Sequence, residues 1–281
     1  MRILIATGGA GHSDLAVQLG NAFTEAVGAE AVILHVVREK SDKEHGEGLL
    51  KRAKRLWAPH QLTPEVKVRV GEPAAEIVRE AREGNYRLIV IGERIHHRIL
   101  SRLLSPTGER VIAQAPCPVL VAKGLTREFQ NILVCDSGSA EQPLIGRFTS
   151  ALPELLTPET EVTVLHVMSQ MGAAPGVRAW QLRADADSLI RAQTPEGELL
   201  VHDLELLERS PAHSEAKVRH GRVVDEILAE AESDTYDLVV IGTHRMQGWQ
   251  RFLLDDIARQ VIHDVQRPIL IIQQAHTEEE R

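Results

Sequence analysis

The chain has 281 residues, of which 43% are hydrophobic and 26% charged, with a formal net charge of −8. No apolar run reaches the roughly 18 residues that a membrane-spanning helix needs, and the start, MRILIATGG, lacks the charged-then-apolar shape of a secretory signal. We therefore expect a globular protein of the cytoplasm with no membrane partner. The only cysteines, Cys117 and Cys135, exclude a disulfide framework.

The two halves of the chain differ in charge. Residues 1–126 carry 18 Lys and Arg against 14 Asp and Glu, whereas residues 127–281 carry 14 against 26. A basic half can bind anions or nucleic acid, but nine aromatic residues provide few platforms for base stacking. We favour ordinary solvated charge and predict no nucleic-acid partner.

Short apolar runs between turn residues predict the strands. In the first half they lie at 2–7, 31–37, 66–70, 87–92 and 118–122. In the second half they lie at 131–136, 162–168, 216–220, 237–242 and 268–272. Near-continuous Val, Ile and Leu are typical of parallel strands buried on both faces. Between them, Ser13 is a candidate helix N-cap, and Pro73 suits the first turn of another helix.

The second half repeats the first. Gly92 matches Gly242 and Pro118 matches Pro268 at a constant offset, and a unit of this length is a whole domain. We predict domains at 1–124 and 128–275, each with the order βαβαβαβαβ. The fold class is α/β, with two tandem doubly wound, Rossmann-like domains of five parallel strands.

The second domain carries a helical insertion around 170–210. From His166 to Arg219 it spans 19 residues more than the first domain spans from His35 to Arg69. We expect a longer or doubled helix broken at Pro195 and Gly197, with an apolar stripe of Leu199, Leu204 and Leu207. We favour a helical hairpin that covers its own domain over a lid that binds a partner.

The chain resembles the universal stress protein family in a tandem arrangement. The resemblance rests on the segment CDSGS, two LHV strands, R-x-G-x-P-x-x-E-I at 69–77 and the repeated VIG and final-strand pattern. It implies a fold similar to the adenine-nucleotide α-hydrolases, and many members bind ATP. It also implies that the last strands, 118–122 and 268–272, pair with each other and make an intramolecular pseudo-dimer.

The phosphate loop of ATP-binding members is lost in both domains. That loop reads G-x-x-G, nine residues, then G with Ser or Thr, so that backbone N–H groups and a hydroxyl hold phosphate. The second glycine and the closing pair are Ile95 and Ser105-Pro106 in the first domain, and Arg245 and Asp255-Asp256 in the second. A carboxylate about 4 Å from a phosphate charge would cost roughly 4 kcal/mol at an effective dielectric near 20.

Ligand-binding candidates lie where a doubly wound sheet makes its crevice, at the carboxyl ends of the strands. The resemblance places Asp136 at the adenine-contacting aspartate and Val167 at a nucleoside contact. In the first domain, basic residues and hydroxyls offer an anion site, although a plain exposed loop is the favoured interpretation. The candidates are Thr7, Gly8, Val36, Gly92, Arg94, Arg98, Ser105, Thr107, Asp136, Ser137, Val167, Gly242, Thr243 and His244.

Other chemistry is not indicated. His35 and His166 lie in apolar strands and are interpreted as hydrogen-bonded core residues, and His96-His97 lacks the spacing of a zinc site. Cys117 is assigned to packing. Cys135, near the crevice, leaves a reactive thiol open. We predict no metal and no catalytic residue.

We therefore expect a non-enzymatic stress-response protein that acts as a regulatory or ligand-sensing module. No resident cofactor is predicted, and ATP, AMP or a small anion is the ligand that the resemblance leaves open. The alternatives are a weak ATPase that uses the basic loop of the first domain, through Arg98 or Arg102, and an adaptor for a protein partner. Further homo-oligomers are also left open.

Overall fold

The computed structural model describes residues 1–9, 11–57, 63–95, 102–103, 105–124, 126, 128–136, 143–169, 183–233, 236–243 and 256–274. Residues 170–182 of the predicted insertion lie outside this range, as do Arg98, Ser137, His244 and Asp255. In the described part, no helix is long and apolar enough to cross a membrane.

All ten predicted strands form. In the first half they are β1 (Arg2–Ala6), β2 (Glu30–Val37), β3 (Glu65–Val70), β4 (Leu88–Gly92) and β7 (Val119–Ala122). In the second half they are β8 (Asn131–Asp136), β9 (Glu161–Ser169), β10 (His213–Gly221), β11 (Leu238–Thr243) and β12 (Ile269–Gln273). A short antiparallel pair, β5 (Arg94–Ile95) and β6 (Arg102–Leu103), follows β4.

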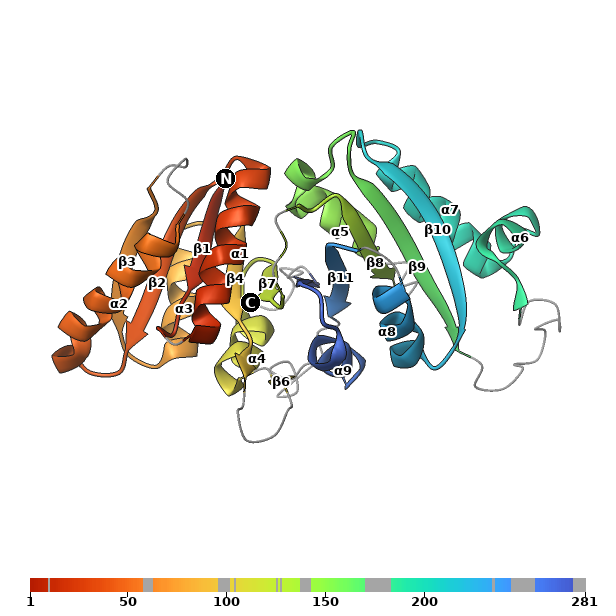
Figure 1. The fold of residues 1–281 in the computed structure, drawn as a ribbon. Helices are drawn as coiled ribbons and strands as arrows, with labels where there is room; N and C mark the ends of the chain where they lie inside the picture. Colours follow the sequence, from red (N-terminus) through yellow and green to blue (C-terminus); the bar gives the residue numbers. More distant parts are fainter. Residues whose placement is uncertain are drawn as a thin grey trace, which may run out of the picture.

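The ten long strands join into one sheet in the order β10-β9-β8-β11-β12-β7-β4-β1-β2-β3. Each half is parallel and doubly wound, and the halves meet where β12 runs antiparallel to β7, with Leu270 opposite Leu120. Figure 1 shows the first domain in red to yellow and the second in green to blue. The predicted fold class and the pairing of the two last strands are confirmed.

Helices cover both faces of the sheet because successive strand residues point to opposite sides. Ile3 and Ile5 belong to one core and Leu4 to the other. The first core packs under α1 (Gly11–Val27), α2 (Lys43–Leu56), α5 (Leu144–Ala151) and α7 (Pro195–Leu207). The second packs under α3 (Pro73–Glu83), α4 (Pro106–Gln114), α8 (Val223–Ser233) and α9 (Asp256–Asp264). A helix α6 (Ala186–Arg191) and two 3-10 turns, η1 (Lys40–Asp42) and η2 (Pro153–Leu155), complete the described elements.

The helix starts were predicted with mixed success. Pro73 stands in the first turn of α3, as expected, and the Glu72 carboxylate accepts a hydrogen bond from the Ala75 N–H. The Ser13 prediction was wrong, because α1 already begins at Gly11. Gly9, at φ 77°, adopts a left-handed backbone conformation that glycine tolerates, and the chain turns there, before Ser13.

The insertion contains two helices that cover their own domain, as favoured. The break falls before Pro195, where the Thr194 hydroxyl caps α7 by accepting from the Gly197 N–H at 3.0 Å. The prediction that Gly197 also breaks the helix was wrong, because Gly197 lies inside α7. A Cβ there would lie 2.3 Å from the Leu189 carbonyl oxygen, so glycine permits α6 and α7 to pack closely.

The predicted apolar stripe of α7 was partly wrong. Leu207 is fully buried, but Leu199 and Leu204 are only partly buried. Their place on the buried face is taken by Leu200 and Asp203, which, with Leu207, face α5, β9 and β10. The buried carboxyl of Asp203 is therefore a feature of the packed side of the helix.

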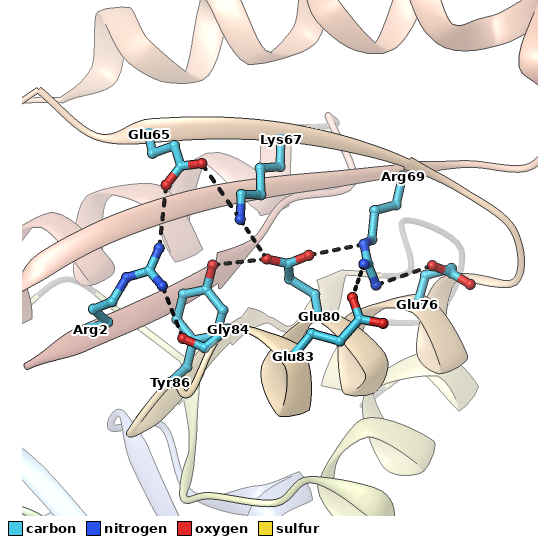
Figure 2. Close-up of polar contacts among 9 residues, drawn as sticks. All are labelled: Arg2, Glu65, Lys67, Arg69, Glu76, Glu80, Glu83, Gly84 and Tyr86. Atoms are coloured by element: carbon cyan, nitrogen blue, oxygen red, sulfur yellow. Dashed lines mark hydrogen bonds and ion pairs between the residues drawn. The ribbon is translucent and has the colours of Figure 1, made fainter.

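Each outer strand is held to its helix by an equivalent charged cluster, and Figure 2 shows that of the first domain. The buried Glu80 of α3 accepts hydrogen bonds from Lys67 at 2.9 Å and Tyr86 at 3.0 Å and pairs with Arg69 at 2.9 Å. Burial alone would raise the pKa of Glu80, but the bonds from Lys67 and Tyr86 lower it below its ordinary value. In the second domain Glu230 is surrounded in the same way by Lys217, Arg219 and Tyr236.

Polar contacts lock the two domains across the central strand pair. Lys123 is 1% exposed, and its ammonium donates to the carbonyl oxygens of His263 at 3.1 Å and Val265 at 2.9 Å, at the end of α9. In the opposite direction, Gln273 donates to the Ile112 carbonyl of α4 at 3.1 Å. The seam therefore connects the crevice-forming helices of both domains.

Candidate functional site

A pocket of about 490 Å³ lies at the carboxyl ends of β8, β9 and β11 in the second domain. This is the place where a doubly wound sheet forms its ligand crevice. The volume falls within the range of small-molecule sites, roughly 300 to 1,000 Å³. The lining consists of Cys135, Asp136, Leu144, Arg147, Leu165, His166, Val167, Val223, Ile227, Ile241, Gly242, Asp256, Ile257, Ala258 and Val261.

Three residues selected from the sequence meet in this pocket. Asp136 ends β8, Val167 lies near the end of β9 and Gly242 lies near the end of β11. Thr243, the next residue, is buried and is not part of the lining. The predicted nucleoside contacts are thus brought together in one cavity.

Asp136 shares a hydrogen bond with the buried Asp203 of α7, which is 4% exposed. Burial raises the pKa of Asp203 to about 8, and the hydrogen bond to Asp136 and its negative charge act in the same direction. Two adjacent carboxyl groups avoid repulsion when one keeps its proton. Near neutral pH, Asp203 is therefore the protonated donor, and Asp136 is the acceptor at the pocket wall.

His166 lines the pocket beside this pair. Its burial lowers the pKa of the imidazole below its ordinary value, although the Asp136 charge opposes the change. Its ring also hydrogen-bonds the Asp136 backbone. The equivalent His35 is buried and donates from Nδ1 to the Thr7 carbonyl oxygen at 2.8 Å. The core interpretation is confirmed for His35, whereas His166 also forms part of the site.

Arg147 of α5 places a cation at the same cavity. Its Nη1 donates to the Ile272 carbonyl at 3.1 Å, and its Nη2 lies against Gly242, where an added Cβ would be 3.1 Å away. Burial lowers the pKa of the guanidinium, while the Asp136 charge counteracts this. Among the described residues, no carboxylate lies within ion-pair distance of Arg147.

The first turn of α9 closes the pocket. Asp256, exposed at the start of the helix, belongs to the lining, as its place in the degraded loop predicts. Its carboxylate suits the positive end of the helix dipole but repels a phosphate chain. Next to it, Ile257 is 49% exposed and offers an apolar contact at the mouth.

The first-domain crevice is built differently. Thr7 is buried at the end of β1, Gly8 is exposed, and Val36 and Gly92 are half-buried at the ends of β2 and β4. Ser105 is the N-cap of α4, where its hydroxyl accepts from the Gly108 N–H at 3.1 Å, and Thr107 follows in the first turn. The side chains of Arg94 and Arg98, which carried the predicted anion site, lie outside the described residues.

A buried carboxylate, Glu93, follows the end of β4. It is 5% exposed, directly follows Gly92, and its Oε1 lies 3.2 Å from the Lys123 ammonium. No hydrogen bond reaches Glu93 Oε1 among the described residues, so the contact is an ion pair.

Both thiols are protected. Burial raises the pKa of Cys117 to about 12 and raises that of Cys135 well above its ordinary range, with Glu230 and Asp136 adding to the latter effect. A thiolate at Cys135, the possibility that the sequence left open, would therefore be unfavourable. Within the described residues, no group of three or more His, Cys, Asp and Glu could hold a metal ion.

Arg147 and Asp203 were not predicted from the sequence as residues of the site. Asp203 carried a signal, since it stands three residues after Leu200 and four before Leu207 on the apolar side of α7. Arg147 directly precedes the core residue Phe148 and reaches the pocket only because α5 packs beside β12. Neither the polar partner of Asp203 nor the position of Arg147 over Gly242 is visible in the sequence pattern.

The chain is a tandem, doubly wound α/β protein with a crevice at the carboxyl ends of the second-domain strands. The model of the universal stress protein family matches the chain twice, at residues 1–123 and 128–273. The chain belongs to the universal stress protein family.

The chain is also similar to individual proteins. A universal stress protein of Methanocaldococcus jannaschii is 36% identical over 86 residues, which are 31% of this chain and 51%, about half, of that protein. The crystal structure of a universal stress protein from Archaeoglobus fulgidus is similar over 97% of this chain and 98% of its own, at 19% identity and a TM-score of 0.68. A universal stress protein solved in complex with cAMP is similar to 43% of this chain and covers 95% of its own, at 23% identity and a TM-score of 0.36.

Proposed function

We propose that the chain is a non-enzymatic stress-response module that senses a nucleoside-type ligand in the pocket of its second domain. The observation that carries the proposal is the convergence of Asp136, Val167 and Gly242 on one cavity of about 490 Å³. The carboxylate can accept hydrogen bonds from the exocyclic amino group of a base, and the apolar walls can enclose the ring.

The protonation states of the lining support binding rather than turnover. Burial raises the pKa of Cys135, so its thiol is a poor nucleophile, and burial lowers the pKa of His166, so its imidazole is neutral. Asp136 is already hydrogen-bonded to Asp203. These described groups can hydrogen-bond the polar edge of a bound base, but they do not form a nucleophile activated by a general base.

A bound ligand has a direct structural route to the first domain. Asp256 and Val261 of α9 line the pocket, and the carbonyls of His263 and Val265 at the other end of α9 accept hydrogen bonds from Lys123. Lys123 in turn pairs with Glu93. A ligand that moves α9 would thus alter contacts at the crevice of the first domain.

Isothermal titration calorimetry with adenosine tests the binding proposal. Wild type should bind, and Asp136→Ala should lose about 10- to 100-fold in affinity because a hydrogen bond to a charged acceptor is removed. Asp187→Asn, at an exposed position of α6, is the control and should bind like wild type. Absence of adenosine binding, or equal binding by Asp136→Ala, would reject the proposal.

Turnover is measured separately. Phosphate release from ATP by wild type should not exceed that of a protein-free blank. Release above the blank that is lost in Arg98→Ala would instead support the ATPase alternative.

A further inference from the structure

Arg147 is a half-buried cation with no ion-pair partner among the described residues. It lines the pocket, and no described carboxylate lies within ion-pair distance of it. Its Nε is buried and has no hydrogen-bond partner among the described residues. A buried N–H group without a hydrogen-bond acceptor is costly, and a guanidinium that is partly removed from water is stabilised by a nearby anion. An anionic ligand would supply both.

The position of the guanidinium defines where that anion would lie. Nη1 is fixed on the Ile272 carbonyl, and Nη2 rests against the backbone of Gly242. The cation therefore lies over the end of β11, on the side of the cavity formed by α5. Its planar group can make two parallel hydrogen bonds to a phosphate or carboxylate.

Two carboxylates limit the size and placement of the anion. Asp136 also faces the pocket and would repel an anion bound beside it. Asp256, at the start of α9, would repel further phosphates that extend past Arg147. Both effects favour one compact anionic group over a chain of phosphates.

We propose that Arg147 binds the phosphate of a nucleoside monophosphate and makes the second-domain pocket prefer that ligand over the free nucleoside. The inference rests on the proposed function of the pocket. It assigns the phosphate to a side chain of α5, in place of the missing glycine-rich loop. In the first domain, counting from the matched Thr7 and Asp136 positions, Gln18 stands at the corresponding place, so this cation belongs to the second domain.

The test compares AMP with adenosine by calorimetry on the full chain. Wild type should bind AMP about 10- to 100-fold more tightly than adenosine, the range expected for a charge-assisted bidentate contact. Arg147→Gln should reduce AMP affinity to that of adenosine, so that the ratio of the two affinities falls to about one. Arg147→Lys keeps the charge without the planar group and should bind AMP with intermediate affinity. The matched control is Arg209→Gln, at an exposed position after α7, which should retain the preference.

The outcomes separate the two proposals. If adenosine binds and AMP binds no better, the pocket function stands and the role of Arg147 is rejected. If Arg147→Gln weakens both ligands equally, Arg147 only supports the pocket structure, and the inference is also rejected. If neither ligand binds wild type, both proposals fail. A circular dichroism spectrum and an unfolding midpoint like those of wild type would show that Arg147→Gln is folded.

Discussion

Asp203 should make the stability of the protein depend on pH. Burial next to Asp136 raises the pKa of its carboxyl from an ordinary 3.8 to about 8 in the folded state. Between these values the folded chain holds a proton that the unfolded chain has released. The free energy of unfolding therefore falls as the pH rises, by up to about 1.4 kcal/mol per pH unit from this group. The stabilisation is complete below the unfolded pKa and is lost as the pH rises through the folded pKa.

The substitution Asp203→Asn isolates this contribution. An asparagine can still donate a hydrogen bond to Asp136 but cannot release a proton in this range. Urea unfolding at pH 5.5 and pH 7.5 should show that wild type loses about 2.5 to 3 kcal/mol relative to Asp203→Asn over the two pH units.

Asp187→Asn, exposed on α6, should follow the wild-type pH dependence and serves as the control. A difference between wild type and Asp203→Asn that stays constant from pH 5.5 to pH 7.5 would refute the shared-proton interpretation.

Three further predictions concern the rest of the molecule. Lys123→Met should lower the free energy of unfolding by about 3 to 5 kcal/mol because Glu93 is left buried without its cation. Adding Glu93→Gln should restore part of this loss, and a double variant as unstable as Lys123→Met would exclude the unpaired Glu93 charge as the cause. Glu230→Gln should lower the free energy of unfolding by about 2 to 4 kcal/mol at pH 7. Since hydrogen bonds lower the pKa of Glu230 against the effect of burial, the difference in stability from wild type should disappear as the pH falls below about 4.5, and a difference that persists at acid pH would contradict a role for the ionised carboxylate. Cys135 and Cys117 should react slowly with a thiol reagent at pH 8 in the folded protein and quickly in denaturant, because burial raises both pKa values, and equal rates would argue against protected thiols.

The sheet could be predicted from the sequence because its signal is local. Buried parallel strands read as short Val, Ile and Leu runs, and all ten were found within a few residues of their bounds. The pairing of β7 with β12 was expected from the family resemblance, since apolar runs alone do not specify which strand edges meet, and the structure adds that the pair is antiparallel. The start of α1 was missed because the Gly8-Gly9 turn admits the helix before Ser13.

The site was only half predictable for a different reason. Asp136, Val167 and Gly242 lie at strand ends, where chain position implies spatial position. Arg147 and Asp203 reach the same pocket from helices, and their roles depend on how α5 and α7 pack on the sheet. A contact between residues far apart in the chain has no periodic signature.

The central claim is that the second-domain pocket accepts a nucleoside-type ligand but has lost the seat for a triphosphate. Calorimetry with AMP, ADP and ATP on wild type and Asp256→Asn measures it most directly. Because Asp256 is exposed, solvent screens its charge, and each added phosphate should weaken binding by about 5- to 10-fold. Asp256→Asn should reduce the loss of affinity that accompanies each added phosphate. Affinity that instead rises from AMP to ATP and is unaffected by Asp256→Asn would contradict the account.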